Sequence, residues 1–531
     1  MATTQIQKTE PAHSLLYEPS SLVNKTDSNI EMYSKIVDSC LTNQFNDSQK
    51  KVFESSFNER VTLLWGPPGT GKTTVLAGIV LGWIEKAQIE MTNKIIAVGS
   101  SNWTAIDNLL SEISKLIEQR RKNIGEFNIP VETKRVRSRS GVPQNTEYIY
   151  DIVVSEGTAY SLYKELENPQ KCIIVGSTWK QFFNLSKGLS WRNPAAAKKW
   201  FDLLLIDEAS QVKVAQAAAY FLLLKESANV VFAGDDKQLG PIFGYQLEDH
   251  SDGLFDCIYT YMKETHKIIP KQIIDNYRSN HDINFWPNQR FYENQLNSIN
   301  AKKRLSISLP PSKPANWPAE LIWDDSYLKI LDPELPIVVI TYPSQTFTVF
   351  NPFEAQIISA LTCLYRISLN TSTSDSQFYE TKLGIVTPHR AQRSNIQNLL
   401  MKYSGINANS SIVVDTVDRF QGQERDLIMA SYTVADKDFV ASEESFILDP
   451  RRFNVSLTRA KSKFILLISD SILKHLPSEK EIATNAAHIQ LFVEKYCKSL
   501  QAQNLAFIDN NGNKVEIPCN LKVPITTVTE L

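Results

Sequence analysis

Short apolar runs recur along the chain and alternate with longer stretches whose apolar residues follow helical spacing. Such runs, bounded by polar or turn residues, are typical of parallel strands that are buried on both faces. The runs are Val61–Trp65, Ile95–Val98, Cys172–Val175, Leu203–Ile206, Val230–Ala233, Ile337–Ile340, Leu383–Val386, Ile412–Val414, Leu427–Ala430 and Phe464–Ile468. Strands that alternate with helices in this way predict an α/β fold with doubly wound parallel sheets.

The strand runs fall into two sets, which a proline-rich segment separates. Residues 309–318 (LPPSKPANWP) have the composition of a linker. The predicted order is a flexible N-terminal arm, 1–40, a first domain, 41–330, a second domain, 331–485, and a C-terminal tail, 486–531. Within the tail we expect a helix from Ala487 to Leu500 and then a hairpin, Leu505 to Pro518, that turns at Asn510-Asn511-Gly512.

The segment from about residue 110 to 170 is longer than the crossover between two parallel strands requires. It predicts a subdomain inserted into the first domain. Its basic residues are Lys115, Arg120, Arg121, Lys122, Lys134, Arg135, Arg137 and Arg139. Two interpretations stay open for these charges: a solvated surface, or an arm that contacts nucleic acid.

Composition narrows the class of protein. The net charge of −2 over 531 residues confines any nucleic-acid site to a local patch or channel. The six cysteines form no Cys-x-x-Cys pair, which argues against a zinc ribbon or an iron–sulfur cluster and fits a reducing compartment. The N-terminus has no apolar core of signal-peptide length, and no apolar run is long enough to span a membrane. We therefore expect an intracellular protein, cytoplasmic or nuclear, that makes no membrane contact.

A glycine-rich loop follows the first strand run and precedes a helical stretch. The sequence GPPGTGKT at residues 66–73 satisfies the pattern G-x-x-x-x-G-K-[S/T] in the context that this pattern requires. Glycines let backbone N–H groups turn toward phosphate oxygens, and the helix N-terminus adds partial positive charge. The predicted nucleotide-binding residues are Gly66, Gly69, Gly71, Lys72, Thr73 and Thr74. We expect ATP and Mg²⁺ as ligands, with Lys72 on the β- and γ-phosphates and Thr73 on the metal.

Two carboxylates, Asp207 and Glu208, follow the strand run Leu203–Ile206. They are therefore predicted at the carboxyl edge of the sheet, where open α/β sheets bind ligands. Asp207 is a candidate Mg²⁺ ligand, and Glu208 is a candidate to orient and deprotonate the attacking water. After the next strand run comes Gln238, which is either a sensor of the γ-phosphate or part of a polar turn.

The second half of the chain offers arginines. Phosphoryl transfer needs positive charge on the transferred oxygens, and a second domain can bring that charge to the ATP site when the two domains close. Arg278 and Arg459 are candidates, although position in the chain alone would not separate them from surface arginines.

The order of these motifs resembles that of superfamily 1 helicases, and above all the 1B branch. That branch contains the nonsense-mediated-decay RNA helicase and the helicase half of the replication nuclease-helicase. The resemblance extends from about residue 41 to residue 470. The motifs are Asn46-Asp-Ser-Gln49, the loop at 66–73, Gly99-Ser-Ser-Asn102, Val175-Gly-Ser-Thr178, Asp207-Glu-Ala-Ser-Gln211, Gly234-Asp-Asp-Lys-Gln238, Asn276-Tyr-Arg278, Thr387-Pro-His-Arg-Ala-Gln392, Asp415 to Glu424, and Arg451 to Lys461.

The resemblance implies two tandem RecA-like domains with ATP bound in the cleft between them, and a role for each matching residue. Gln49 and Tyr277 would contact the adenine base, and Gln238, Arg278 and Arg459 would contact the γ-phosphate. Gly422 and Glu424 would couple nucleotide binding to strand binding, with Glu424 near the ribose. The residues that would touch the backbone of the nucleic acid are Ser101, Asn102, Ser177, Thr178, Thr387, Pro388 and Thr416.

The sequence also departs from the family pattern. Asp236 stands where the family often has histidine, Gly240 where it often has proline, and Ser100 replaces another common proline. These departures leave the local geometry open. Relatives often carry a β-barrel ahead of the glutamine motif, where only about 40 residues precede it in this sequence.

Our leading hypothesis is an ATP- and Mg²⁺-dependent helicase or translocase that moves 5′ to 3′ on single-stranded RNA or DNA, the direction following from the resemblance alone. The second is an ATP-gated switch that clamps or remodels a nucleoprotein without unwinding, which the short N-terminal segment favours. The third, a binding scaffold with an inactive ATP site, conflicts with the intact Lys72, Asp207 and Glu208. Protein partners are expected on the tail or the insertion. The motifs do not distinguish RNA from DNA, because that choice depends on contacts to the 2′-hydroxyl.

Overall fold

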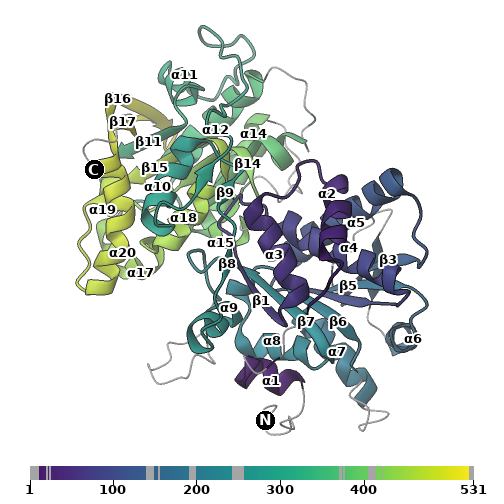
Figure 1. Ribbon diagram of the computed structural model, residues 1–531. Coiled ribbons are helices and arrows are strands. Elements are labelled where there is room, and N and C mark those ends of the chain that lie inside the picture. The colour runs from purple at the N-terminus through teal and green to yellow at the C-terminus, as the bar shows by residue number, and fades with distance from the viewer. Residues whose placement is uncertain are drawn as a thin grey trace. The chain divides into compact units, whose positions relative to one another are not determined.

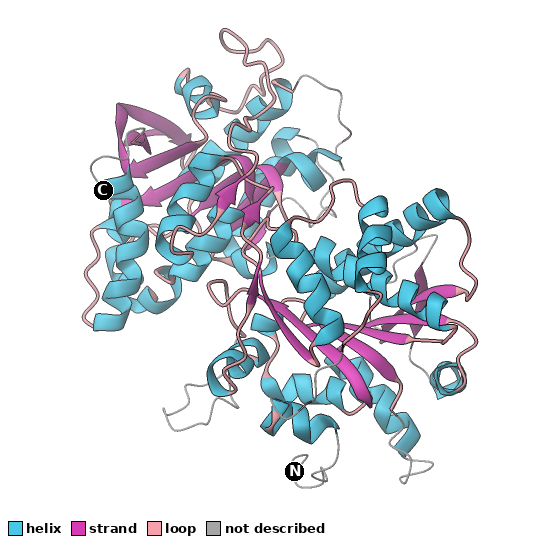
Figure 2. Ribbon diagram, in the orientation of Figure 1, coloured by secondary structure: helices cyan, strands magenta, loops and turns pink. Residues whose placement is uncertain are grey.

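The structure is a computed structural model that describes residues 11–525 apart from 20–21, 23–25, 139–140, 142–148, 154–155, 191–198, 242–255, 370–373, 375–376, 405–413 and 421. The chain divides into two compact units, Met1–Ile274 and Asp275–Leu531. In each unit a sheet is covered by helices on both faces (Figures 1 and 2). The predicted α/β class with two doubly wound sheets is confirmed.

The first unit contains an eight-stranded sheet in which every strand pairing is parallel. The strand order is β4 (Ile149–Val153), β3 (Val131–Arg137), β5 (Cys172–Thr178), β2 (Ile95–Ser100), β6 (Phe201–Ile206), β7 (Leu224–Gly234), β1 (Val61–Trp65) and β8 (Lys271–Gln272). The apolar runs predicted as strands occupy β1, β2, β5, β6 and β7. Their side chains are buried because helices cover both faces.

Two layers of helices cover this sheet (Figure 1). On one side lie α2 (Ile30–Cys40), α3 (Asp47–Asn58), α4 (Lys72–Glu90) and α5 (Trp103–Ile124), and on the other α1 (Pro11–Tyr17), α7 (Trp179–Ser190) and α8 (Val214–Phe221). Shorter segments are the 3₁₀ turn Ala209–Gln211, α9 (Ile258–Thr260) and the π-helical turn Tyr261–Thr265. Helix α2 falls within the predicted flexible arm, yet Tyr33 and Val37 are fully buried in the core.

The predicted insertion extends the sheet and is not a separate subdomain. It contributes much of α5, the strands β3 and β4 and the helix α6 (Glu156–Glu167). Most of its basic side chains are neutralised inside the unit. The ion pairs are Arg120–Glu85, Arg121–Glu118, Lys134–Glu132, Lys134–Glu165, Arg135–Asp107, Arg135–Asp151 and Arg137–Asp151. These ion pairs therefore support neither of the two interpretations left open by the sequence, a solvated surface or an arm that contacts nucleic acid. Arg139 lies outside the described residues.

The Arg120→Ala variant is expected to lose about 3–5 kcal/mol of unfolding free energy, because Glu85 would remain buried without its partner. Arg120 Nε donates to Glu85 Oε1 at 2.7 Å, and the two side chains are 9% and 3% exposed. Urea denaturation measures the loss. Lys115→Ala is the control: the side chain of Lys115 is 71% exposed in its pair with Glu112, and its loss should stay below about 1 kcal/mol. Equal losses in both variants would contradict a stabilising role for the buried pair.

The second unit contains a seven-stranded mixed sheet. The strand order is β13 (Val414–Thr416), β12 (Leu383–Thr387), β14 (Arg425–Ser431), β15 (Ala460–Ser469), β11 (Ile337–Tyr342), β17 (Lys514–Pro524) and β16 (Cys497–Ile508). The first five strands are parallel, as predicted, whereas β17 runs antiparallel to both of its neighbours. Of the run predicted at 412–414, residues 412 and 413 lie outside the described residues.

The predicted hairpin near the C-terminus is confirmed and is longer than expected. Strands β16 and β17 pair along their length, and Gly512 in the connecting turn has a φ of 83°. The helix expected to continue to Leu500 ends earlier: α20 (Lys480–Leu491) and a π-helical turn, Phe492–Tyr496, come before β16. Residues 497–499 are extended because they pair with residues 522–524 of β17. The hairpin therefore closes one edge of the second sheet.

Helices also cover both faces of the second sheet (Figure 1). The helices with main packing roles are α10 (His281–Phe291), α11 (Ser326–Leu331), α12 (Pro352–Ile367), α14 (Arg390–Ser404), α18 (Pro450–Thr458) and α20. The short segments are the strands β9 (Asp275–Asn276) and β10 (Asn297–Ser298), the helices α15 (Val417–Phe420), α16 (Lys437–Ser442), α17 (Glu444–Ile447) and α19 (Asp470–Leu473), and the π-helical turn Phe378–Lys382. No helix in the described part of the chain is both long and apolar enough to cross a membrane.

Residues 275–330 belong to the second unit, whereas the sequence placed the change of domain near residue 330. Ser279 Oγ donates to the Ala460 carbonyl at 2.6 Å, and Asn280 Nδ2 donates to the Ser462 carbonyl at 2.9 Å. Within the proline-rich segment, Trp317 is buried in the core of the second unit. Residues 275–330 are thus attached by hydrogen bonds to backbone carbonyls and by one buried tryptophan. Neither feature produces a run of apolar residues, so the sequence pattern did not predict the attachment.

All six cysteines are buried and unpaired. They are Cys40, Cys172, Cys257, Cys363, Cys497 and Cys519. Burial disfavours the thiolate and raises the pKa of every one of these thiols, to about 11 for Cys257 and Cys363.

Candidate functional site

The glycine-rich loop lies between β1 and α4 in the first unit. Gly69 and Gly71 have φ values of 77° and 85°, a left-handed conformation that glycine adopts without steric cost. Thr70 closes the turn by donating its Oγ1 to the Pro67 carbonyl at 2.8 Å. These residues give the loop the curved backbone that the sequence motif predicts.

Lys72 begins α4 and lies across the loop. A Cβ atom on Gly66 would come within 2.5 Å of Lys72 Cγ, so glycine is needed for the lysine to take this path. Lys72 Nζ donates to the Gly66 carbonyl. No side chain among the described residues caps α4, and Thr73 and Thr74 are half-buried in its first turn. The uncapped N-terminus and the lysine together suit a phosphate group.

Gln49, the predicted adenine contact, is fixed against this loop. It forms a capping box with Asn46 at the start of α3, in which its Oε1 accepts from the Asn46 N–H at 3.1 Å. Its Nε2 donates to the Thr70 carbonyl at 3.2 Å, and only 5% of the residue is exposed. Residues 21 positions apart in the chain are thus joined.

Asp207 and Glu208 lie at the carboxyl end of β6, as predicted. The Asp207 N–H donates to the Gly99 carbonyl at 2.9 Å, and the Glu208 N–H donates to Asp207 Oδ1 at 2.8 Å. Glu208 has a φ of 50°, a left-handed conformation that non-glycine residues seldom adopt and that is found preferentially at functional sites. Burial and the charge of Glu208 raise the pKa of Asp207 to about 7, against the opposing charge of Lys72.

The segment after β7 adjoins the glycine-rich loop, since the Gly66 N–H donates to the Gly234 carbonyl at 3.2 Å. Gln238 is 2% exposed, and its Nε2 donates to Asp235 Oδ2 at 2.8 Å. Asp236 replaces the histidine common in the family. It pairs with Lys263 at 2.6 Å and accepts from Trp65 Nε1 at 3.1 Å, so this departure strengthens the end of β1.

The residues of the first unit that are matched to nucleic-acid contacts lie at the carboxyl ends of β2 and β5. Ser101, Asn102 and Thr178 are half-buried, and Asn102 caps α5 by accepting from the Ala105 N–H at 2.8 Å. Ser177 differs, because it is fully buried and its Oγ donates to the Val136 carbonyl at 2.5 Å. Its hydroxyl therefore links β5 to β3 and is not presented to a ligand.

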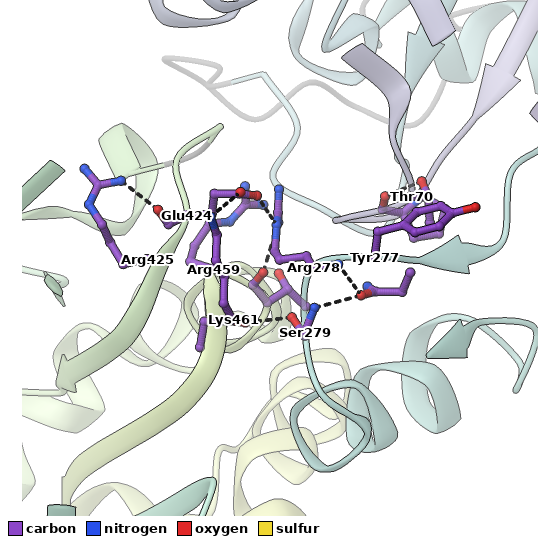
Figure 3. Close-up of polar contacts among 12 residues, drawn as sticks. Thr70, Tyr277, Arg278, Ser279, Glu424, Arg425, Arg459 and Lys461 are labelled. Carbon is purple, nitrogen blue, oxygen red and sulfur yellow. Dashed lines mark hydrogen bonds and ion pairs between the residues drawn. The ribbon is translucent and has the colours of Figure 1, made fainter. Parts of the chain in front are cut away.

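In the second unit, Glu424 links two basic residues (Figure 3). Arg278 Nε donates to Glu424 Oε2 at 2.5 Å, and Lys461 Nζ lies 2.7 Å from Glu424 Oε1. Arg278 Nη1 also donates to the Thr458 carbonyl at 3.0 Å. Burial raises the pKa of Glu424, but the charges of Arg278 and Lys461 outweigh burial and lower this pKa to about 2. Arg278 is thus held by a carboxylate that stays ionised.

Arg459 follows α18 at its C-cap and is 2% exposed, with its Nε donating to the Val455 carbonyl at 3.3 Å. Its own carbonyl accepts from the N–H of Arg425, the residue after Glu424, at 3.1 Å. Gly422 has a φ of 82° in the same region, and Tyr277 is half-buried. The second unit thus brings Arg278, Glu424 and Arg459 together from three distant motifs, as Figure 3 shows.

Thr387 and Thr416 end the neighbouring strands β12 and β13 and stand opposite each other in register. Thr387 is fully buried, with its Oγ1 3.0 Å from Thr433 Oγ1, and Thr416 is 8% exposed. Pro388 is half-buried. The Thr387 hydroxyl therefore does not face a ligand, and of these three residues Pro388 is the most exposed.

Behind Thr387 lies a buried carboxylate that the sequence did not single out. Glu354 of α12 is fully buried and accepts from the Tyr342 hydroxyl at 2.5 Å, the Thr433 N–H at 2.9 Å and Ser431 Oγ. Burial raises the pKa of Glu354 to about 7. The sequence offered one modest signal: Asn351 as N-cap and Pro352 as first residue mark the start of α12, but they do not predict a buried carboxylate.

Comparison with known proteins accounts for most of the chain. Two AAA domain family models match, over residues 49–244 and 254–471. The human DNA replication ATP-dependent helicase/nuclease DNA2 is 27% identical over 469 residues, and the Arabidopsis thaliana regulator of nonsense transcripts 1 homolog is 24% identical over 491 residues. A solved arterivirus nonstructural protein 10 (helicase) in complex with DNA aligns with 80% of this chain and 63% of its own at 10% identity, with a TM-score of 0.35.

These matches cover 83% and 87% of this chain but 40% and 36% of DNA2 and of the nonsense-transcript regulator. The chain therefore spans less than half the length of these relatives. The two domain models adjoin along the chain and together cover residues 49–471 apart from 245–253. The chain belongs to the superfamily 1 helicases.

Proposed function

We propose that the protein hydrolyses ATP when single-stranded nucleic acid is bound, and that hydrolysis drives movement along the strand and the separation of duplexes. One observation carries this proposal. In the first unit, the loop at 66–73 and the acidic pair lie at one edge of the sheet. The residues matched to nucleic-acid contacts, at 101–102 and 177–178, lie at the same edge, because β1, β7, β6, β2 and β5 are consecutive β-strands of one parallel sheet.

The residues have distinct roles in this proposal. Lys72 and the first turn of α4 bind and orient the phosphates, and Gln49 and Tyr277 hold the base. Glu208 orients the attacking water and takes its proton on the carboxylate. The positive charge that phosphoryl transfer requires comes from Arg278 and Arg459, and Gln238 senses the γ-phosphate.

The donor set also fits a divalent cation. Asp207 and Thr73 offer oxygen atoms, the ligands that Mg²⁺ prefers. Burial and the charge of Glu208 raise the pKa of Asp207 although Lys72 opposes them, so a divalent cation would favour the ionised carboxylate. When bound, Mg²⁺ would neutralise charge on the β- and γ-phosphate oxygens.

The apparent affinity for Mg²⁺ is expected to fall as the pH drops from 8 to 6. A cation binds the ionised carboxylate, and Asp207, with a pKa of about 7, becomes protonated over this range. Each pH unit below 7 should raise the Mg²⁺ concentration needed for half-maximal binding of a fluorescent ATP analogue by up to about tenfold. Binding in EDTA is the control, and a constant Mg²⁺ requirement between pH 6 and pH 8 would contradict the role of Asp207.

Steady-state ATP hydrolysis tests the proposed function. The rate is measured without nucleic acid, with a uridine homopolymer RNA and with an oligo-dT DNA. We expect at least one polymer to raise the rate several-fold. A rate that is indifferent to both polymers would reject a nucleic-acid motor, and stimulation without duplex separation would instead support an ATP-gated clamp.

Direction is tested separately. We propose movement from 5′ to 3′, following the resemblance to the 1B branch. In stopped-flow experiments a dye at the 3′ end of the strand should report arrival after a lag that grows with strand length. A dye at the 5′ end should show no such lag. The six unpaired thiols support an intracellular location, in the cytoplasm or the nucleus.

A further inference from the structure

The strands β2 and β6 are neighbours in the first sheet, and Gly99 pairs in register with Ile206. The segments that follow these strands therefore start side by side at the carboxyl edge. One segment carries Ser101 and Asn102, matched to strand contacts. The other carries Glu208, the proposed general base. The topology thus places the two functions of the proposed motor next to each other within one unit.

Gln211 joins these two segments. It ends the 3₁₀ turn that starts at Ala209, and its N–H donates to the Glu208 carbonyl at 2.8 Å. The turn brings its side-chain Nε2 to 3.4 Å from Glu208 Oε2, to which it donates. Its Oε1 accepts from Ser101 Oγ at 3.1 Å and from Asn102 Nδ2 at 3.5 Å. One amide group therefore contacts the proposed base with one end and both strand-contact residues with the other.

The hydrogen bonds of Gln211 allow nucleic-acid binding to affect Glu208. Ser101 Oγ and Asn102 Nδ2 donate hydrogen bonds to the amide oxygen of Gln211. A phosphate of a bound nucleic-acid strand would accept hydrogen bonds from the same two groups. Once a phosphate takes these donors, the amide loses its anchor and is free to rotate. The hydrogen bond that it donates to Glu208 stabilises the carboxylate and occupies one of the oxygens needed to take a proton from water.

We propose that Gln211 is a positioning residue that restrains Glu208 until a strand engages Ser101 and Asn102. This inference rests on the proposed function and adds its regulation. The contacts of 3.4 and 3.5 Å are long, and Gln211 is half-buried, as a side chain that must release its partners should be.

The test compares ATP hydrolysis by the full chain with and without a saturating oligo-dT or uridine homopolymer strand. In Gln211→Ala we expect the rate without a strand to rise about two- to tenfold, the range that loss of one hydrogen bond allows. The stimulated rate should change little, so the ratio of the two rates falls toward one. Strand affinity, measured by fluorescence anisotropy, should stay close to that of the unaltered protein.

A double-mutant cycle separates this route from a structural effect. If strand binding acts on Glu208 through Gln211, Ser101→Ala combined with Gln211→Ala should give the same ratio of rates as Gln211→Ala alone. Gln216→Ala is the matched control: Gln216 is also half-buried, and its Oε1 accepts from the Lys213 N–H at 3.0 Å. This variant should keep the ratio of the unaltered protein.

The possible failures are distinguishable. An unaltered protein that no strand stimulates rejects the proposed function, and the role of Gln211 with it. A stimulated protein whose Gln211→Ala variant keeps the full ratio overturns the role of Gln211 alone. A parallel fall of both rates in Gln211→Ala, together with a lower urea midpoint, also overturns it, because the residue would then be structural.

Discussion

Glu208→Gln should bind ATP with nearly unchanged affinity and hydrolyse it at least about 100-fold more slowly. A positioned general base typically contributes about 10²–10⁴ to the rate, and glutamine has nearly the same shape but cannot take the proton of the attacking water. Glu208 is 8% exposed and has a left-handed backbone at the carboxyl end of β6.

The measurement is single-turnover hydrolysis beside equilibrium binding of a fluorescent ATP analogue. Glu226→Gln is a suitable control, because Glu226 is an exposed carboxylate on β7 of the same sheet. Its rate should match that of the unaltered protein. A Glu208→Gln variant that retains more than about a tenth of the rate would show that another group activates the water.

Arg459→Ala should lower the rate of hydrolysis by about 10³-fold, again with little effect on ATP binding. An arginine on the transferred phosphoryl group is worth about 10³–10⁵ in rate, because it neutralises charge that develops in the transition state. Arg459→Lys should rescue little, since lysine cannot place two parallel donors on one phosphate. Arg459 is 2% exposed, so its urea midpoint must be checked beside its activity.

Arg451→Ala is the matched control for Arg459. Arg451 lies in α18, the helix that Arg459 follows, but its side chain is 51% exposed and pairs with Asp449 at 2.9 Å. Loss of this surface arginine should leave hydrolysis unchanged. If Arg451→Ala and Arg459→Ala lower the rate equally, the effect belongs to the helix and not to a specific arginine.

The sequence predicted the central strands because each is a short apolar run that helices bury on both faces. The strands β3 and β4 escaped prediction, since Lys134, Arg135 and Asp151 give them a polar sequence. In the fold, Asp151 pairs with Arg135 and Arg137, and Lys134 pairs with Glu132 and Glu165. Residue patterns do not reveal pairs of charges that are distant in the chain, and so the sequence left a solvated surface and a basic arm as open interpretations.

In the candidate site, too, some features could be predicted from the sequence and others could not. The loop at 66–73 and the acidic pair are contiguous motifs, and the structure places them at one sheet edge as expected. By position, Ser177 and Thr387 match residues that contact nucleic acid in the family. In the structure, however, both hydroxyls are buried: Ser177 bonds to Val136, and Thr387 lies against Thr433. Motif matching selects loops by position, whereas the atoms of each loop that face outward depend on packing, which the sequence does not show.

The buried cysteines have a practical consequence for observing a motor of this kind. A maleimide dye reacts with the thiolate, and every native thiol combines burial with a raised pKa. A cysteine introduced at an exposed position, such as Met91 or Leu476, would therefore react far faster than the native six. Donor and acceptor dyes could then follow a single molecule through its nucleotide cycle without prior removal of any native cysteine.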